Sequence, residues 1–330
     1  MVNLTFRKAG RYGLDCRIVA NVSKLSEDEW LELRKQGITG TDLAGITGIS
    51  RYSSPTAVYM NKLGLIEDKV DNDFMRWGRI MESIIRDEFQ RKNQEFDVKP
   101  SKMMFCHKDK TWMRANVDGL IYTDEGVGIL EIKTADKYLT HLWKGEEVPV
   151  QYMTQIQWYM AVTGAKFGYF AVLIGGNTYV QKKVNRDDEL IEILTGLAED
   201  FYLNNILKKV IPVVDGSEAT GKLLNTLYGD SKNNVLEMGE RETELLNERE
   251  TLLLEKEAID ERLSLIENSI KDVMQENDTL VNSSFKVTWK TQTRKSIDSK
   301  KLRELNPSLA DEVTKESKNR VFKVRRIQEK

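Results

Sequence analysis

Three charged side chains in the middle of the sequence have the types and spacing of a metal-dependent hydrolytic site. Asp118 lies in the segment Asn-Val-Asp-Gly, and Glu131 and Lys133 follow in the segment Glu-Ile-Lys. Alternate side chains of a strand share a face, so Glu131 and Lys133 are expected to point the same way. Two carboxylates held close together repel each other unless a cation neutralises them. We therefore expect Asp118 and Glu131 to bind a divalent cation, with Lys133 orienting or deprotonating a water molecule or stabilising the transition state.

Two further groups could complete this metal site. They are the backbone carbonyl of Ile132 and the carboxylate of Glu82, which lies on a predicted helix upstream. The chain has two cysteines, Cys16 and Cys106, and two histidines, too few for a closed zinc site or an iron–sulfur cluster. Oxygen ligands remain, and they favour Mg²⁺, with Mn²⁺ as a substitute.

A β-hairpin is predicted to position the three residues. Segments 111–122 and 128–134 flank the turn Thr-Asp-Glu-Gly-Val, whose composition is typical of turns. In this hairpin Asp118 would meet Glu131 on the partner strand, while the apolar residues that alternate with the charged ones face the core. The alternative is a surface hairpin whose charges face solvent.

Helices are predicted on both sides of the hairpin. The one at about 71–93 carries an apolar stripe at helical spacing that we expect in the core, namely Phe74, Trp77, Met81, Ile84, Ile85 and Phe89. The one at about 150–163 carries Gln151, Gln155 and Tyr159 on one side. A buried strand at 166–176 and a helix at 187–209 follow.

Shorter helices are predicted near the N-terminus. Residues 27–37 form the first, which Gly37 ends. Thr41-Asp42 is a plausible N-cap for the next, and Pro55 could begin a third.

The C-terminal third has a different pattern. Met238, Leu245, Leu252, Ile259, Ile266, Val273 and Leu280 recur every seven residues, while Arg249, Lys256 and Asn277 interrupt the second apolar row. We interpret residues 238–280 as a long charged helix that lays one apolar seam on another surface. Phe285, Val287 and Trp289 alternate in a β pattern within residues 284–298.

Charge is unevenly distributed over this region, although the net charge of the chain is −2. Residues 236–280 hold 14 acidic and 5 basic residues, and residues 282–330 hold 14 basic and 6 acidic ones. The basic C-terminus could meet phosphate without sequence preference. We therefore divide the chain into a catalytic core at 1–210, a linker and long charged helix at 211–280, and a basic β-containing extension at 281–330.

Several motifs together resemble those of the YqaJ-like viral recombinase family of PD-(D/E)XK nucleases, which includes relatives of phage lambda exonuclease. They are WGRIMESIIRDEF around Glu82, NVDG at Asp118, EIK at 131–133, and QYMTQIQWYM with Gln155 and Gln157. The proline of the superfamily's name is absent before Asp118, where Val117 stands. The resemblance covers about residues 27–180.

A further stretch resembles the segment with which this family binds a 5′-phosphate. It contains Trp30 and Arg34, followed by Ile-Thr-Gly-Thr at 38–41. Thr41 replaces the family's typical serine and keeps the hydroxyl. A bidentate guanidinium and nearby hydroxyls suit a terminal phosphate.

The resemblance implies a restriction-endonuclease-like α/β fold, a mixed central sheet flanked by helices, here with a C-terminal long-helix and β extension. It implies catalytic roles for Glu82, Asp118, Glu131, Lys133 and Gln155, metal contacts from Asp118, Glu131, the Ile132 carbonyl and Glu82, and 5′-phosphate or DNA contacts from Arg34, Thr39, Thr41 and Gln157. The implied activity is Mg²⁺-dependent 5′-to-3′ digestion of one strand of linear double-stranded DNA. The 3′ overhang would pass to a phage single-strand annealing protein, and the implied assembly is a homo-oligomer, a trimeric ring.

Two other functions fit parts of the sequence. An endonuclease or resolvase could use the same core, and a DNA-binding recombination mediator could use the charged helix and basic tail without cleavage. The sequence has no signal-peptide pattern and no run of about 18 apolar residues. We expect a phage- or prophage-encoded protein in the bacterial cytoplasm, with no membrane partner.

Overall fold

The computed structural model describes residues 6–50, 52–66, 72–230, 234–293, 295, 299–314 and 322–326. The chain divides into two compact units, residues 1–227 and 228–330, so the first unit extends beyond residue 210. In the described residues, no helix is both long and apolar enough to cross a bilayer.

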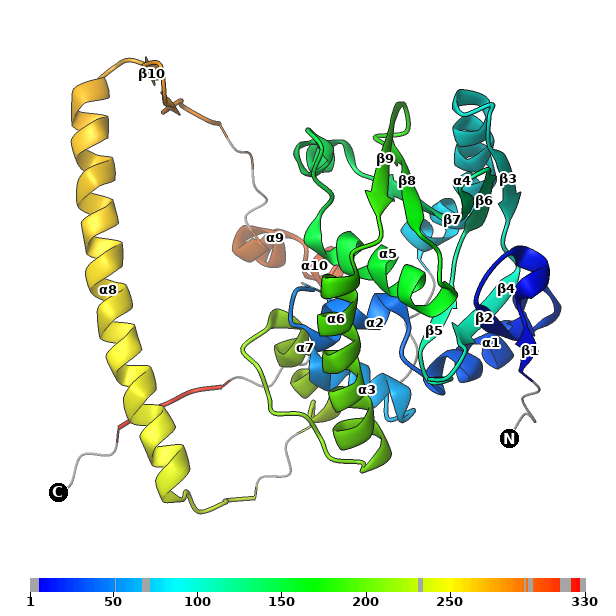
Figure 1. The fold of residues 1–330 in the computed structure, drawn as a ribbon. Coiled ribbons are helices and arrows are strands. Elements are labelled where there is room, and N and C mark those ends of the chain that lie inside the picture. Colours follow the sequence, from blue (N-terminus) through cyan, green and yellow to red (C-terminus); the bar gives the residue numbers. More distant parts are fainter. Residues whose placement is uncertain are drawn as a thin grey trace. The chain divides into compact units, whose positions relative to one another are not determined.

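The first unit is built on a mixed five-stranded sheet (Figure 1). In spatial order its strands are β3 (Asp97–Pro100), β6 (Gly119–Thr123), β7 (Gly126–Ala135), β8 (Phe167–Ile174) and β9 (Thr178–Asn185). The central β7 and β8 are parallel, and the other neighbours are antiparallel. A second sheet has the order β1 (Arg7–Lys8), β2 (Cys16–Asn21), β4 (Met103–His107) and β5 (Arg114–Asn116).

The helices of this unit surround the sheets. They are α1 (Glu27–Lys35), α2 (Gly40–Ile46), α3 (Pro55–Lys62), α4 (Asp73–Lys92), α5 (Val150–Thr163), α6 (Asp188–Phe201) and α7 (Glu218–Leu227). Shorter helical turns are η1 (Gly10–Tyr12), η2 (Val22–Lys24), η3 (Lys137–Trp143) and the π-helical η4 (Tyr202–Leu207), which continues α6.

Helices cover both faces of the central sheet. On one face, Ile85 and Phe89 of α4 pack with Leu130 and Ile132 of β7. On the other, Ile156 of α5 belongs to the main core. Both faces of β7 are therefore buried, which explains its nearly continuous apolar sequence. The mixed α/β sheet flanked by helices is confirmed.

The predicted hairpin is only half correct. The second half of its first strand and its second strand are observed as β6 and β7, but residues 114–116 form β5, which pairs with β4 in the second sheet. The chain crosses between the sheets at Val117 and Asp118. Alternation of side chains along a segment does not reveal which neighbouring strand each half of the segment pairs with. The prediction therefore joined β5 and β6 into one strand.

The apolar stripe on α4 is also buried over only half its length. Ile85 and Phe89 are buried, and Met81 packs at the edge of their cluster. Phe74, Trp77 and Ile84 are exposed, so the prediction of a fully buried stripe was wrong. Helical spacing shows which side chains share a face but not how far along the helix the sheet extends.

Two N-terminal helix starts can be compared with the sequence. Pro55 is the first residue of α3, as predicted, and Ser54 caps it. The N-cap of α2 is Thr39, not Thr41 or Asp42. Its backbone N–H donates to the Asp42 carboxylate over 2.6 Å. Asp42 lies in the first turn, where a carboxylate can accept this bond.

The second unit begins with a single long helix, α8 (Glu240–Met274). A short hairpin follows, formed by β10 (Thr279–Val281) and β11 (Lys286–Thr288), and then two short helices, α9 (Ser299–Leu305) and α10 (Pro307–Glu312). The predicted long helix therefore ends before Leu280, which lies in β10. The predicted β pattern is confirmed in part at β11, and residues 294 and 296–298 of that prediction lie outside the described residues.

Candidate active site

The carboxylates of the predicted site lie at the junction of the two sheets. Asp118 stands at the bend that leads into β6, one residue before the pair Gly119–Leu130 in the ladder with β7. The register therefore places Asp118 beside Glu131. Its Oδ2 accepts a hydrogen bond from the backbone N–H of Ile132 over 2.7 Å. A backbone donor thus fixes the first carboxylate.

Glu131 points away from α4 and toward α5. Its Oε1 accepts hydrogen bonds from Lys133 Nζ over 2.6 Å and from Gln155 Nε2 over 2.8 Å. Gln155 also accepts a bond from Lys133 over 3.1 Å and donates one to the hydroxyl of Tyr159 over 2.9 Å. Asp118, Glu131, Lys133 and Gln155 are therefore brought together as expected, with Tyr159 behind them.

One oxygen of this group has no partner. Glu131 is 3% exposed, and in the described part of the chain no hydrogen-bond donor reaches its buried Oε2. A buried carboxylate oxygen without a partner costs free energy. A divalent cation is the kind of ligand that would satisfy it, so the residues present fit a hard metal ion.

The electrostatics of the group point the same way. Burial, together with the neighbouring Glu131, raises the pKa of Asp118 well above its ordinary value. Burial also raises the pKa of Glu131, although Lys133 and Gln155 partly oppose this. Excess negative charge in a buried place is the condition that a bound cation relieves.

Lys133 responds to the same charges. Burial by itself lowers the pKa of its ammonium, but Glu131 and Asp118 outweigh burial and raise it above the ordinary value. Its Nζ also lies 5.2 Å from the centre of the Tyr152 ring. The charged amine is thus held between a carboxylate, an amide and an aromatic face.

In the part of the chain that the structure describes, Glu82 is hydrogen-bonded within its own helix and not to the side chains of this group. It accepts from Arg86, one helical turn later, over 3.1 Å. Its charge contributes to the raised pKa values of Asp118 and Glu131. Nevertheless, among the described residues no three Asp, Glu, His or Cys side chains come together as a ready-made metal cluster. The structure therefore gives a two-carboxylate group with a third carboxylate nearby.

The predicted phosphate-binding residues form a second cluster at the start of α2. Arg34 Nη2 donates to the Thr41 hydroxyl over 2.9 Å, and the hydroxyls of Thr41 and Thr39 are 3.0 Å apart. Thr39 donates to Asp42 over 2.7 Å. Because a hydroxyl has one proton, Thr41 must donate to Thr39. The guanidinium of Arg34 also lies over the Trp30 ring, 4.7 Å from its centre.

A buried ion pair supports this cluster and was missed in the sequence. Lys62 Nζ contacts Asp42 Oδ2 over 2.6 Å and donates to the carbonyl of Arg34 over 2.9 Å. Burial would raise the pKa of Asp42, but Lys62 and Arg34 outweigh it, so this pKa is lowered. The position of Asp42 three residues after Thr39 was a detectable capping signal, whereas nothing local indicated Lys62.

The two clusters approach each other at Gly40, where the start of α2 contacts α5. A methyl group at this position would lie 2.7 Å from Cε1 of Tyr159 and 3.2 Å from the carbonyl oxygen of Gln155. The start of α2 therefore touches α5 at the residues that contact Glu131. A glycine is needed here for the close approach of two helices.

Gly40→Ala is expected to lower nuclease turnover roughly tenfold or more, because even a small displacement of substrate-positioning groups is costly. The protein should still fold, since the added methyl forces α2 and α5 apart only locally. Gly196→Ala on α6 is the matched control, because a methyl group there meets nothing within 4 Å. Steady-state digestion rates, with circular dichroism as the folding check, measure the difference. Equal rates for the two variants would contradict the role of Gly40.

Residues 29–166 match the YqaJ-like viral recombinase domain. The chain is 32% identical over 317 residues to the uncharacterized protein YqaJ of Bacillus subtilis (strain 168). The aligned region covers 94% of this chain and 98% of that protein. The chain belongs to the YqaJ-like viral recombinase family. The matched residues 29–166 of this family's domain include the carboxylate group, Gln155 and the Arg34–Thr41 cluster.

Two solved structures are also similar to this YqaJ-like chain. One is the alkaline exonuclease LHK-Exo from Laribacter hongkongensis, with a TM-score of 0.47, 18% identity, and 61% of this chain and 98% of that chain covered. The other is a phage-related exonuclease from Haemophilus somnus 129PT, with a TM-score of 0.41, 13% identity, and 55% and 100% covered.

One predicted DNA-binding residue of the YqaJ-like domain lies elsewhere. Gln157 is 1% exposed, and its amide nitrogen donates to the carbonyl of Asn185 over 2.8 Å. Its amide oxygen accepts from the backbone N–H of Asp187 over 3.0 Å. This position is two residues from Gln155, on another face of α5. Gln157 connects α5 to the segment between β9 and α6, and we do not include it among the proposed DNA contacts.

The shifted pKa values of the YqaJ-like site predict a pH dependence. Folding raises the pKa values of Asp118 and Glu131, so the folded state binds protons more tightly than the unfolded state. The stability of the metal-free protein should therefore fall as the pH rises from the unfolded carboxyl values, about 4, through the folded ones.

Urea unfolding in EDTA over a range of pH values measures this slope. Asp118→Asn should flatten it, because the amide keeps an acceptor for Ile132 but does not titrate. Asp124→Asn, in the exposed turn of the same hairpin, serves as the control. The interpretation fails if Asp118→Asn and the control have the same slope as the parent protein.

Proposed function

We propose that this chain is a Mg²⁺-dependent exonuclease that digests one strand of linear double-stranded DNA from its 5′ end. The observation that supports this most directly is the approach of the Arg34–Thr41 cluster to the Asp118–Glu131–Lys133 group through Gly40. A cationic hydroxyl-lined cluster beside a hydrolytic group suits a substrate whose terminal phosphate and scissile phosphate are close together.

The side chains have distinct roles in this proposal. Asp118 and Glu131 hold the divalent cation, which when bound supplies an acidic water and offsets phosphate charge. The Ile132 carbonyl and Glu82 are proposed as additional contacts to the cation or its water shell. Lys133, which hydrogen-bonds to Glu131 and Gln155, is proposed to donate to a phosphate oxygen or to the attacking water.

The end preference is assigned to the cluster on α1 and α2. Arg34 carries the charge and the fork of donors that a terminal phosphate accepts. Thr41 is exposed and could exchange its bond with Arg34 for one with the phosphate, whereas Thr39 is 4% exposed and is held by Asp42. We therefore assign direct contact to Arg34 and Thr41, and a supporting contact to Thr39.

The resemblance to the family adds two partners to the proposal. A single-strand annealing protein would receive the 3′ overhang that digestion leaves. A homo-oligomer, a trimeric ring by resemblance, would keep the enzyme on the duplex. Family membership supports a deoxyribonuclease, and the direction of digestion rests on the phosphate cluster.

One set of digestions tests the proposal. The substrates are a linear duplex with 5′-phosphate ends, the same duplex with 5′-hydroxyl ends, and a closed circle, each with Mg²⁺ or with EDTA. We expect loss of the linear phosphorylated duplex in Mg²⁺ alone, slower loss of the hydroxyl form, and an intact circle. Cleavage of the circle would identify an endonuclease, and binding without any digestion would identify a recombination mediator.

A further inference from the structure

The helix α8 of the second unit carries an apolar row that its own unit leaves uncovered. The row consists of Leu245, Leu252, Ile259, Ile266 and Val273, all of them exposed. In this helix of 35 residues the row repeats over five heptads. Within α8 the structure shows one ion pair, Lys271–Glu267 at 3.8 Å, in the residues it describes. Internal ion pairs therefore give α8 little support, and a long amphipathic helix of this kind is stabilised by a partner.

A second row of side chains, next to the apolar row on α8, restricts which partner helix can pack there. Three residues before each apolar position, this mixed row runs through Glu242, Arg249, Lys256, Leu263 and Ile270. The first three residues of the mixed row are charged and the last two are apolar. A partner helix must therefore accept charge at one end and apolar side chains at the other.

The charges argue against two parallel copies of α8 in register. In that arrangement each mixed-row residue faces its own counterpart, so Arg249 would meet Arg249 and Lys256 would meet Lys256. We call the apolar row and the mixed row together the seam. Beside the seam, Glu255 of one copy would face Asp260 of the other. Like charges at these positions destabilise the pair.

Two antiparallel copies remove every one of these conflicts in a single register. The mixed row of each copy then faces the apolar row of the other, in the pairs Leu263 with Leu252, Ile270 with Leu245, Lys256 with Ile259, Arg249 with Ile266, and Glu242 with Val273. The stem of Lys256 can lie along isoleucine while its charge reaches water. The guanidinium of Arg249 lies over the Phe322 ring of its own chain, 5.9 Å from the ring centre. Beside the seam, Glu255 of each copy lies next to Arg262 of the other.

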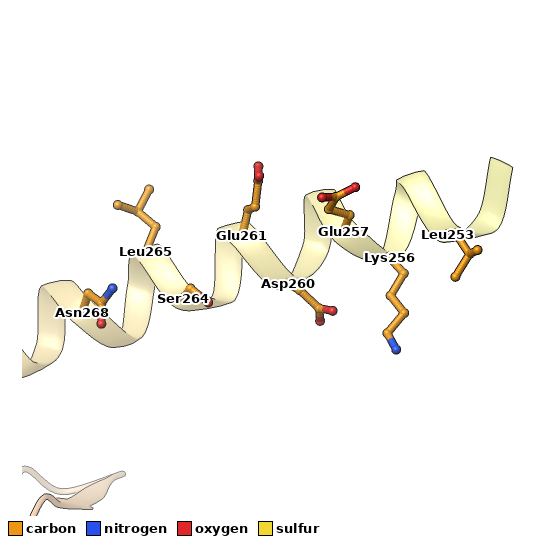
Figure 2. A pocket seen from close by; sticks show the side chains of 8 residues that line it. All are labelled: Leu253, Lys256, Glu257, Asp260, Glu261, Ser264, Leu265 and Asn268. Carbon is orange, nitrogen blue, oxygen red and sulfur yellow. The ribbon is translucent and has the colours of Figure 1, made fainter. Parts of the chain in front are cut away.

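The C-terminal part of the apolar row and its neighbours in the mixed row share one surface of α8. Ile266, Ile270, Val273 and Leu280 line a groove on its C-terminal half. In the middle of the helix, Lys256 and Asp260 point to one side, and Glu257 and Glu261 point to the other (Figure 2). The side of α8 that carries Glu257 and Glu261 also carries Leu265, and it lies opposite Lys256 of the mixed row (Figure 2).

We propose that α8 pairs in antiparallel orientation with α8 of a second copy of this chain. The surface is independent of the nuclease site and of the proposed function. It joins two copies through their second units, with Leu252 and Leu263 as mutual neighbours at the seam.

Two cysteine variants of the full chain test the orientation. In the antiparallel pair, Leu252→Cys faces Leu263→Cys of the other copy, so mixing the two variants should give a disulfide-linked heterodimer under mild oxidation. Each variant alone should stay uncrosslinked, because its two cysteines would be about 16 Å apart along the axis at 1.5 Å per residue. The parent chain, whose Cys16 and Cys106 are buried, is the blank.

Either of two results overturns the proposal. Cross-linking of each variant with itself would show a parallel pair. Absence of any cross-link, at protein concentrations up to about 100 μM, would show that another surface covers the row.

Charge reversal gives a second test that does not depend on removing an apolar residue. In the cysteine background, Glu255→Lys and Arg262→Glu should each lower the cross-linked fraction, with an apparent affinity loss of roughly tenfold because attractions become repulsions at both ends of the pair. Combining the two changes should restore it. Glu257→Lys has the same charge change on the side of α8 opposite Lys256 and should have little effect (Figure 2). A parallel pair would respond oppositely to Glu255→Lys, since the new lysine would face Asp260.

Discussion

Glu131→Gln is expected to lower Mg²⁺-dependent digestion of linear duplex DNA by on the order of 10³-fold or more. Glutamine has nearly the same shape and can still accept from Lys133 and Gln155 through its oxygen. It lacks the charge with which the buried Oε2 would hold a cation. DNA binding in EDTA should change little, because the phosphate cluster on α1 and α2 is untouched. Asp118→Asn should have a similar effect.

A stability measurement separates loss of the metal from loss of the fold. Glu131→Gln removes a buried negative charge whose pKa folding raises, so in EDTA near neutral pH the variant should be at least as stable as the parent. Mg²⁺ should raise the melting temperature of the parent but not of the variant. Glu125→Gln, in the exposed turn of the same hairpin, should behave like the parent in both assays. An unchanged digestion rate in Glu131→Gln, or a Mg²⁺ response equal to that of the parent, would remove Glu131 from the metal site.

Arg34→Ala should slow digestion of 5′-phosphorylated ends by roughly a hundredfold, since a charged hydrogen-bonding group to phosphate contributes about 1.5–3 kcal/mol. Digestion of 5′-hydroxyl ends should fall much less, because those ends lack the group that Arg34 binds. The ratio of the two rates, measured in the same buffer, is the quantity to compare.

Two variants make the effect of Arg34 specific. Arg34→Lys keeps the charge but loses the two-pronged fork, so it should recover only part of the ratio. Arg17→Ala removes an exposed arginine from β2 and should leave the ratio unchanged. Equal losses on phosphorylated and hydroxyl ends in Arg34→Ala would show that Arg34 contributes general DNA affinity and not end recognition.

The local part of the site could be predicted from the sequence. Alternation along one strand placed Glu131 and Lys133 on a common face, and the spacing of Gln155 and Tyr159 placed both on one side of α5. The cysteine and histidine counts favoured oxygen ligands. These predictions needed only the geometry of a single strand or helix, which depends on residues close together in the chain.

The predictions from sequence were wrong where a periodic pattern continues along a segment but the surface that packs against the segment changes. Segment 111–122 alternates throughout, yet it divides between two sheets at Asp118. The stripe on α4 keeps its spacing, yet Phe74 and Trp77 lie beyond the residues that pack on β7. Periodicity reports the conformation of a segment but not the extent of the surface that meets it.

By itself, then, the sequence predicted which residues would form the candidate hydrolytic site and which of them share a face, and it gave the family resemblance that the comparison confirmed. Only the tertiary structure decided that Gly40 brings the phosphate cluster against Gln155 and Tyr159, and that Lys62 anchors Asp42 beneath that cluster. It also placed Gln157 away from the site. The physical reason is that close packing and buried ion pairs join residues far apart in the chain, and such contacts leave no period in the sequence.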